Sequence, residues 1–498
     1  MNDQNGFAEI SAFLDSRNEW LIVHSSTGNS FALKRDEIEI NFERNKILFA
    51  FLDDKGFQIW RVANYKIEKE TLILDLTRNF EREREKIRLV PRVSATDLSE
   101  AVVIARLEKA NRIARLIIAE NPQSKLIRVA LNEENGRFAR IVFENEIKKQ
   151  IAALADVSDL GIPETLLTSS ILWLTELQSR QKNRIETIWI LAEEKLYKNL
   201  RKLHALLDEK WKSRITIGEI SREGAETQSE RIAFKRNLEI EDLWREKPPK
   251  ISVIKNAETS RATSEIIKLA PEKIDVIFTR HGETLRFLGL PFARVRRIGE
   301  EEKVWFGIEK ERHILNENSR DDFFDLLKNL DAYRRFDSTN KRHSFFRLAP
   351  EAWLEAILRR NVKLLDGNLI LSPVYNQFRA GADKIDLLAL RRDGRLIVIE
   401  LKVAPDREMI FQAIDYWRKV ELQRRSGNLQ KAKIFGDSEI SDKSALVYLV
   451  APTLSFHPNF NFLSKTVSPE IEIYKFYLNE NWREELKVMN VSKLRSEK

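Results

Sequence analysis

The strongest constraint on this chain comes from one short hairpin motif that carries three charged residues. Two apolar runs, KIDLLAL and LIVIELKV, flank Arg392–Arg395, whose Asp-Gly pair is typical of a tight β-turn. Side chains alternate along a strand, so Glu400 and Lys402 share one face, and the turn brings Asp386 beside Glu400. Burial of three charges among apolar side chains is costly unless they pair or hold a metal ion. The motif therefore predicts a charged site within an apolar sheet.

The residue types at this site favour a hard divalent cation. Two carboxylates suit Mg²⁺, or Mn²⁺, which also binds waters and phosphate oxygens. The metal would lower the pKa of bound water, and Lys402 would orient that water or stabilise charge that develops on a phosphate. The chain has no cysteine and only 6 histidines, which excludes thiolate sites and disfavours a histidine-rich zinc site. We therefore expect Mg²⁺ or Mn²⁺ as the cofactor.

Two helices are predicted to flank the hairpin. The segment PEAWLEAILRR before it carries Glu351 and Glu355, which are four residues apart and share a face. The segment DREMIFQAIDYWRKVELQRR after it carries Gln412 and Tyr416 at the same spacing. This second helix also has basic side chains suited to a phosphate backbone, and two of them are candidate substrate contacts: Arg407 and Arg418.

Taken together, these residues resemble the PD-(D/E)xK nuclease superfamily. The resemblance depends on residues in the following order: Glu355, Asp386, Glu400-Leu401-Lys402, Gln412 and Tyr416. The text AGADKIDLLALRRDGRLIVIELKV is most similar to the C-terminal domain of NucS/EndoMS-type DNA endonucleases. The similarity covers roughly residues 348–425, and Ile385 stands where the superfamily name has proline. It implies a restriction-endonuclease-like αβ domain with a central mixed sheet.

The resemblance also implies roles for the residues of the hairpin. Asp386 and Glu400 would bind the metal, and the backbone carbonyl of Leu401 would add a ligand. Lys402 would assist the attack of water. The implied reaction is metal-dependent endonuclease hydrolysis of DNA phosphodiester bonds, in DNA repair or in defence.

The flanking helices have implied roles as well. Gln412 and Tyr416 would lie close to the site and help to position the substrate. A glutamate from the preceding helix would complete the site, and Glu355 matches that role best, with Glu351 as the alternative.

Two other interpretations compete with this one. The fold could serve as a non-cleaving DNA-binding or assembly module, for which Asp386 and Glu400 would be dispensable. The text TRHGET around His281 is similar to the signature of histidine phosphatases, but no other histidine in the chain precedes a glycine, as their second catalytic histidine typically does. We expect residues 279–284 to form a turn between two strands.

The whole chain is predicted to be a multidomain α/β protein, because 498 residues exceed one ordinary core. Residues 1–95 read as a β-rich module with several short aromatic and β-branched runs. Residues 96–345 read as a central α/β region, with helices expected at 145–154 and 164–180 and a polar linker near 221–258. Residues 346–498 form the expected nuclease domain. No repeat of fixed period is visible.

Charge and hydropathy indicate the expected partners and compartment. Lys and Arg exceed Asp and Glu by 85 to 77, which fits DNA as a partner without requiring it. No apolar run is long enough to span a membrane, and the N-terminus lacks the pattern of a signal peptide, so we expect a cytoplasmic protein. Cleavage of both strands would favour a homodimer. The sequence leaves open whether the DNA is duplex, branched or single-stranded, and whether RNA is also cut.

Overall fold

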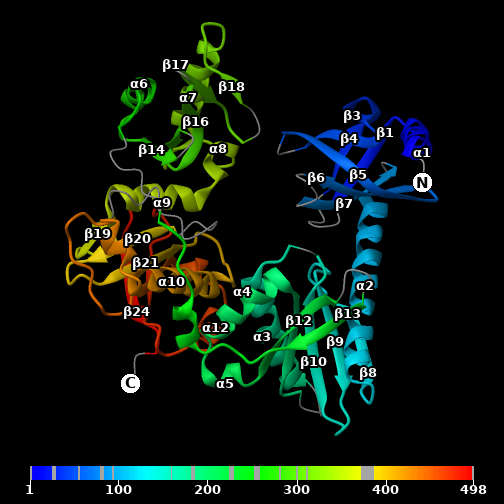
Figure 1. The fold of residues 1–498 in the computed structure, drawn as a ribbon. Coiled ribbons are helices and arrows are strands. Elements are labelled where there is room, and N and C mark those ends of the chain that lie inside the picture. Colours follow the sequence, from blue (N-terminus) through cyan, green and yellow to red (C-terminus); the bar gives the residue numbers. More distant parts are fainter. Residues whose placement is uncertain are drawn as a thin grey trace. The chain divides into compact units, whose positions relative to one another are not determined.

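The protein is a mixed α/β chain with several sheets. The computed structural model describes residues 3–24, 30–53, 56–78, 83–91, 95–158, 160–180, 185–223, 229–251, 258–279, 282–298, 301–309, 312–371 and 386–495. The chain divides into two compact units: Met1–Leu200 with Arg214–Arg236, and Arg201–Ser213 with Asn237–Lys498. The expected central region of residues 96–345 is therefore shared between the two units, with a boundary between Arg236 and Asn237. Each unit contains two of the four sheets that the described residues form (Figure 1).

The first sheet lies in residues 19–91, within the stretch expected as a β-rich module. Its seven strands pair antiparallel in the order β2-β1-β7-β6-β5-β4-β3. They are β1 (Glu19–His24), β2 (Ser30–Lys34), β3 (Ile38–Glu43), β4 (Lys46–Asp53), β5 (Gly56–Glu68), β6 (Thr71–Arg78) and β7 (Glu83–Pro91). Helix α1 (Asp3–Asp15) buries Ile10 and Leu14 in the same core as Trp20 and Phe49.

The second sheet has six strands in the order β13-β12-β11-β10-β9-β8. Its elements are α2 (Ala95–Glu120), β8 (Lys125–Leu131), β9 (Phe138–Glu144), β10 (Gln150–Asp156), α3 (Pro163–Arg180), β11 (Ile188–Glu193), α4 (Glu194–His204), β12 (Ile215–Glu223) and β13 (Ser229–Phe234). The long helix α2 contacts β8, β9 and β13, whereas α3 contacts β10 and β11 (Figure 1). The predicted hairpin at Asn135-Gly136 and the predicted helix at 164–180 are confirmed.

Two expectations for this region were wrong. Residues 150–156, in the stretch expected as a helix at 145–154, form β10. Five of its seven residues are buried, so its apolar pattern does not alternate and cannot be distinguished from a buried helix. Within the expected linker near 221–258, residues 229–234 form the edge strand β13, whose polar residues suit an edge.

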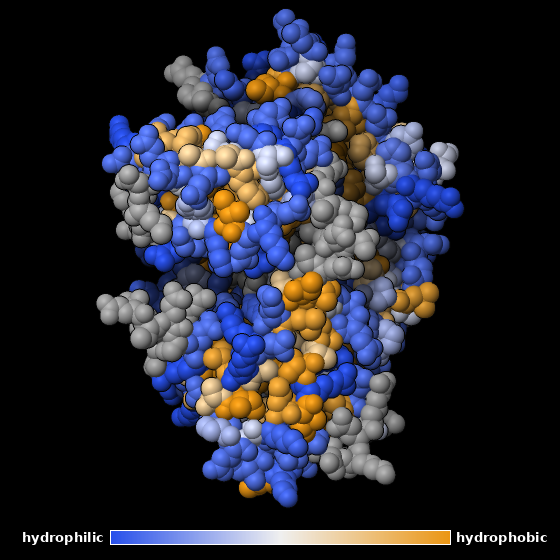
Figure 2. Space-filling model, turned by 90° about the vertical axis from the view of Figure 1, so that its right-hand side faces the viewer, coloured by the Kyte–Doolittle hydropathy of each residue, from blue (hydrophilic) through white to orange (hydrophobic). Residues whose placement is uncertain are grey.

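Apolar side chains also gather on the outer surface of this region. Figure 2 shows them on the lower half of the view, where α2 and β8 lie. The exposed residues there are Val103, Ile104, Leu107, Leu126 and Ile127.

The third sheet is an antiparallel meander, β14-β15-β16-β17-β18. Its elements are α6 (Arg261–Leu269), β14 (Ile274–Thr279), β15 (Gly282–Phe287), β16 (Leu290–Ile298), β17 (Glu301–Phe306), β18 (His313–Ile314), α7 (Arg320–Tyr333) and α8 (Ser344–Arg347). Thr279 pairs with Gly282, so β14 and β15 are antiparallel neighbours on either side of Arg280 and His281. His281 itself lies outside the described residues.

The fourth sheet is mixed, in the order β19-β20-β21-β22-β23-β24. Its elements are α9 (Pro350–Arg360), β19 (Leu369–Leu371), β20 (Leu387–Arg391), β21 (Leu396–Leu401), α10 (Met409–Arg425), α11 (Asn428–Lys431), β22 (Leu446–Pro452), α12 (Phe460–Ser464), β23 (Ile473–Leu478) and β24 (Val488–Lys493). The strands β21, β22 and β23 are parallel, and the other neighbours pair antiparallel. Helix α10 packs on β21 and β22.

The predicted Asp-Gly turn joins β20 to β21. Gly394 has a φ of +78°, which favours glycine, and its N–H donates to the carbonyl of Arg391 at 2.8 Å. All six residues of β21 are buried, which is expected for a strand inside a sheet that has helices packed against it. The described helices include none with the length and apolar character needed to cross a membrane.

Candidate active site

The hairpin of β20 and β21 brings the three predicted charged residues together. Leu387 pairs with Ile399, and continuing this register by one residue sets Asp386 opposite Glu400. The backbone N–H of Leu401 donates to Asp386 Oδ2 at 2.9 Å. Lys402 Nζ lies 2.9 Å from Glu400 Oε1. Tight turn geometry and strand period therefore place these side chains as the sequence predicts.

Glu400 is the most constrained group at the site. Only 2% of the residue is exposed, and Lys402 neutralises one of its oxygens. Its second oxygen, Oε2, is buried and has no hydrogen-bond partner among the described residues. Burial, and then the negative charge of Asp386, raise the pKa of Glu400 well above its usual value, although Lys402 opposes this shift.

Lys402 is a buried ammonium among carboxylates. Burial by itself lowers the pKa of Lys402, but the charges of Glu400 and Glu351 outweigh it and raise the pKa above the ordinary value. A further carboxylate, Asp406 Oδ2, lies 3.4 Å from Nζ. Sequence reasoning missed Asp406, because it stands in the irregular connection after β21, where no period indicates which way a side chain points.

Helix α9 contributes Glu351 to the electrostatics of the site, whereas the sequence favoured Glu355. The charge of Glu351 acts on both Glu400 and Lys402. Glu355 is 2% exposed, and its Oε1 accepts hydrogen bonds from Arg359 at 2.6 Å and Arg286 at 3.3 Å. The structure therefore gives Glu355 buried arginine partners, and the sequence preference for Glu355 over Glu351 stays a prediction. Residues four apart share a helix face but differ by about 6 Å along the axis, so their surroundings can differ.

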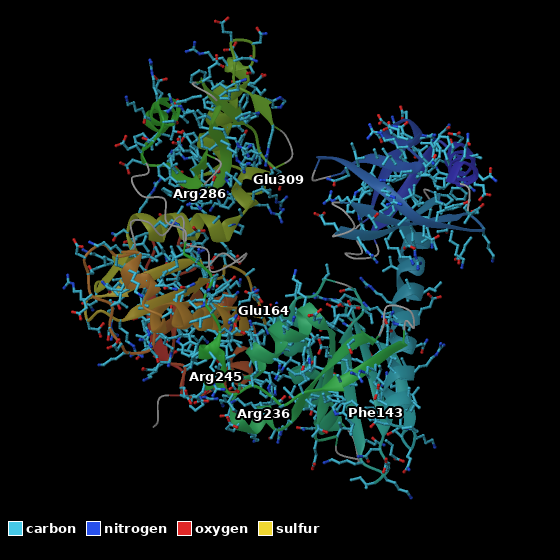
Figure 3. The ribbon with its side chains drawn as sticks, viewed as in Figure 1. Phe143, Glu164, Arg236, Arg245, Arg286 and Glu309 are labelled. Carbon is cyan, nitrogen blue, oxygen red and sulfur yellow. The ribbon has the colours of Figure 1, made fainter. Side chains whose placement is uncertain are left out.

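The third sheet holds α9 in place through buried contacts with the hairpin of β15 and β16. Arg286 on β15, labelled in Figure 3, pairs with both Asp275 and Glu355. At the turn of this hairpin, Gly289 has a φ of +82°, and a Cβ there would lie 1.9 Å from the carbonyl oxygen of Ala352. The backbone of α9 therefore packs directly against a glycine that no other residue can replace without movement.

Arg334 strengthens the same junction. It is fully buried, and it donates hydrogen bonds to five carbonyl oxygens at 2.7–3.2 Å. The accepting residues are Phe287, Leu288, Phe345, Leu348 and Ala349. Burial, and then the charge of Arg483, lower the pKa of Arg334 to about 9. This network joins the hairpin turn to Ala349, the residue immediately before α9.

Helix α10 carries the two candidate positioning residues of the sequence prediction. Gln412 has a buried Oε1 with no hydrogen-bond partner among the described residues. Tyr416 is half-buried, and Lys419 Nζ lies 5.5 Å from the centre of its ring. An unsatisfied buried amide oxygen is unusual in a native structure and is a common feature of binding sites.

The two candidate phosphate contacts differ. Arg407 is half-buried and pairs with Glu408 at 3.1 Å. Arg418 is 6% exposed and pairs with Asp415 at 2.7 Å. Arg418 is buried because α10 is covered by α11, α12 and the segment Ile240–Arg245 as well as by the sheet, so its expected contact with phosphate stays a prediction.

Comparison with known proteins gives only a weak link. No protein-family model and no curated protein matches the chain. Among solved structures, EndoMS in its apo form matches at 9% identity over 38% of this chain and 84% of its own, with a TM-score of 0.12. EndoMS in a complex with double-stranded DNA matches at 9% identity over 36% of this chain and 81% of its own, with a TM-score of 0.14. Scores this low do not establish a shared fold.

The arrangement offers a small set of metal ligands. The described residues contain no group of three or more histidine, aspartate or glutamate side chains in position to bind one ion. Asp386 and Glu400 nevertheless lie side by side, with one buried carboxylate oxygen that no described residue satisfies. This donor set, hard oxygen ligands only, fits Mg²⁺ or Mn²⁺ completed by waters and phosphate oxygens.

Proposed function

We propose that residues 346–498 form a restriction-endonuclease-like domain that hydrolyses DNA phosphodiester bonds with Mg²⁺ or Mn²⁺. The observation that supports this most directly is the buried carboxylate of Glu400, with Lys402 on one oxygen and no described partner on the other. A buried, unsatisfied carboxylate oxygen beside a second carboxylate is costly. A divalent cation between Asp386 and Glu400 would offset that cost.

The backbone of β21 supplies the third ligand of the proposal, the carbonyl of Leu401. In an extended strand the N–H and C=O of one residue point to the same side. The N–H of Leu401 donates to Asp386. The carbonyl oxygen of Leu401 is therefore directed toward the side of the strand on which Asp386 lies.

The remaining residues position water and substrate. When bound, the metal would acidify a water and neutralise charge on the phosphate. Lys402 would hold the attacking water or a phosphate oxygen through its ammonium N–H groups. Glu351 would orient the ammonium from α9, in place of Glu355. Gln412 would accept a hydrogen bond through its buried Oε1, and Tyr416 would lie beside it on α10.

The choice of DNA depends on the sequence resemblance and on the excess of basic residues, which gives a formal charge of +8. Cleavage of both strands of a duplex would favour a homodimer. A non-cleaving DNA-binding or assembly module would bind the same substrates but would not require the two carboxylates.

The test uses a panel of labelled duplex, branched and single-stranded DNAs with Mg²⁺, Mn²⁺ or EDTA. We expect cleavage with either metal, none in EDTA, and none by Asp386→Ala. Asp393→Ala is the matched control, because Asp393 is an aspartate of the same hairpin that pairs with Arg391 away from the site. Cleavage that persists in excess EDTA would refute the metal-dependent mechanism. DNA binding without cleavage under any condition would favour the non-cleaving module.

A further inference from the structure

The second and fourth sheets have the same strand arrangement. In each, six strands follow chain order across the sheet, β8 to β13 and β19 to β24 (Figure 1). In each, the first three strands are antiparallel, the third, fourth and fifth are parallel, and the sixth is antiparallel to the fifth. Agreement of order and direction at every one of these pairings indicates one architecture used twice.

The helices agree as well. A helix precedes the first strand in both, α2 in one and α9 in the other. The crossover between the third and fourth strands is also a helix in both, α3 or α10. It contacts those same two strands, β10 and β11 for α3, and β21 and β22 for α10. Figure 3 labels Phe143 on β9 and Glu164 at the start of α3, in the part of the chain that repeats the catalytic arrangement.

The matching strand ends differ in their chemistry. Asp386 immediately precedes β20, and Arg137 immediately precedes β9. Leu387 pairs with Ile399 and Phe138 pairs with Asp156, so in register Asp156 matches Ile399, and the next residue, Val157, matches Glu400. At the places of the two carboxylates, the earlier hairpin therefore has a guanidinium and an apolar side chain, and its carboxylate Asp156 lies one residue before Val157.

Asp156 is fully satisfied by its own surroundings, unlike Glu400. Its Oδ2 accepts hydrogen bonds from Arg137 Nη2 at 3.0 Å and from the N–H of Gly161 at 3.2 Å. Its Oδ1 accepts from the N–H of Ser158 at 2.8 Å and from Ser158 Oγ at 2.6 Å. Arg137 and Asp156 are both nine-tenths or more buried.

The connection between the first two strands differs in length between the two sheets. In the catalytic sheet it spans residues 372–386, whereas in the earlier sheet it spans only residues 132–137. The short connection is closed by side chains: Asn132 Oδ1 accepts from the N–H of Phe138 at 2.7 Å, and Asn135 Oδ1 accepts from the N–H of Arg137 at 3.0 Å. These bonds hold Arg137 against Asp156.

We infer that residues 95–236 are a second copy of the nuclease-type core in which Arg137 stands in the place of Asp386 and pairs with Asp156, so that this copy binds no divalent cation and catalyses no hydrolysis. Of the two copies, the one in residues 346–498 is therefore the one that carries the proposed catalytic centre. This inference rests on the proposed function for the location of that centre, whereas the pairing of Arg137 with Asp156 stands independently of it.

The first test counts the metal sites of the full chain. Mn²⁺ binding is measured by calorimetry and electron paramagnetic resonance for the wild type, Asp386→Ala and Asp156→Asn. We expect Asp386→Ala to remove the saturable site and Asp156→Asn to leave its affinity unchanged. A saturable Mn²⁺ site that survives Asp386→Ala and is lost in Asp156→Asn would overturn the inference.

The second test measures the coupling between Arg137 and Asp156 by unfolding of the full chain. Arg137→Ala and Asp156→Ala should each lower the melting temperature, because each leaves a buried charged partner. The double variant should lose clearly less than the two single losses added together. If the single variants do not fold and the double variant does, the coupling is supported as well. Strictly additive losses would overturn the inference.

The two proposals fail in different ways. A wild-type chain that neither binds Mn²⁺ nor cuts DNA would refute the proposed function. The coupling between Arg137 and Asp156 would still be measured in that case, and its presence would keep the second copy as a metal-free structural core.

Discussion

The two glutamates of α9 give the sharpest prediction, because one substitution at each should produce opposite phenotypes. Glu351→Gln removes a charge that acts on Glu400 and Lys402, so it should slow DNA cleavage and leave stability almost unchanged. Glu355→Gln removes a charge from a buried cluster with Arg286 and Arg359, so it should destabilise the protein. Both changes keep the size of the side chain.

The magnitudes follow from burial. Removal of one partner from a buried ion pair costs about 3–5 kcal/mol when the other charge is left unpaired. Arg286 keeps Asp275 as a partner after Glu355→Gln, so we expect a lower cost, about 2–3 kcal/mol. That cost corresponds to a fall in melting temperature of about 4–10 °C for a unit of this size. Loss of a group that orients catalytic residues typically costs about 10- to 100-fold in activity, which is our expectation for Glu351→Gln.

The assay pairs single-turnover cleavage at saturating DNA with thermal unfolding, on the same preparations. Measured below the lower melting temperature, Glu355→Gln should cut at close to the wild-type rate. A Glu355→Gln protein that is as stable as the wild type but cuts slowly would show that Glu355 acts at the site. That result would refute the structural role inferred from its contacts with Arg286 and Arg359.

Three further predictions test the site and its support. Lys402→Ala should lower the single-turnover rate by about 100- to 1000-fold while DNA affinity changes little, because its charge matters most in the transition state; an unchanged rate would remove Lys402 from the mechanism. Gly289→Ala should lower the free energy of unfolding by about 2–5 kcal/mol, because its backbone is left-handed and a Cβ would clash with Ala352. A free energy of unfolding equal to that of the wild type would contradict the packing described for α9. DNA affinity, measured by fluorescence anisotropy, should fall steeply between about 50 and 200 mM salt, because contacts with phosphates release counterions from the DNA. An affinity that does not change with salt would argue against a nucleic-acid partner.

The hairpin of β20 and β21 could be predicted because its determinants are local. The Asp-Gly turn sets the register, and the register sets which of Asp386, Glu400 and Lys402 are neighbours. The same holds for the hairpin at Asn135-Gly136 and for the helices at 164–180 and 350–360, whose turn residues and periods are contained in a few consecutive positions. Residues 150–156 were misassigned because both faces of a central strand are buried, which removes the alternation that identifies a strand.

Other features were decided by contacts between distant segments. The helical period placed Glu351 and Glu355 on one face of α9. Arg286, which lies on a strand of the third sheet, pairs with Glu355, and the sequence does not show this contact. Arg418 looks like a surface cation in the sequence, and it is buried because α10 is covered by several elements besides the sheet.

The sequence by itself therefore determined the turn, the strand period and the clustering of three charges, because these depend on neighbours within about twenty residues. Only the tertiary structure decided which glutamate of α9 pairs with Arg286, which arginines are buried, and that residues 95–236 repeat the strand order of the fourth sheet. The repeat leaves no fixed period in the sequence because strand order and direction depend on the alternation of buried and exposed positions and on connection lengths, and many different side chains satisfy both.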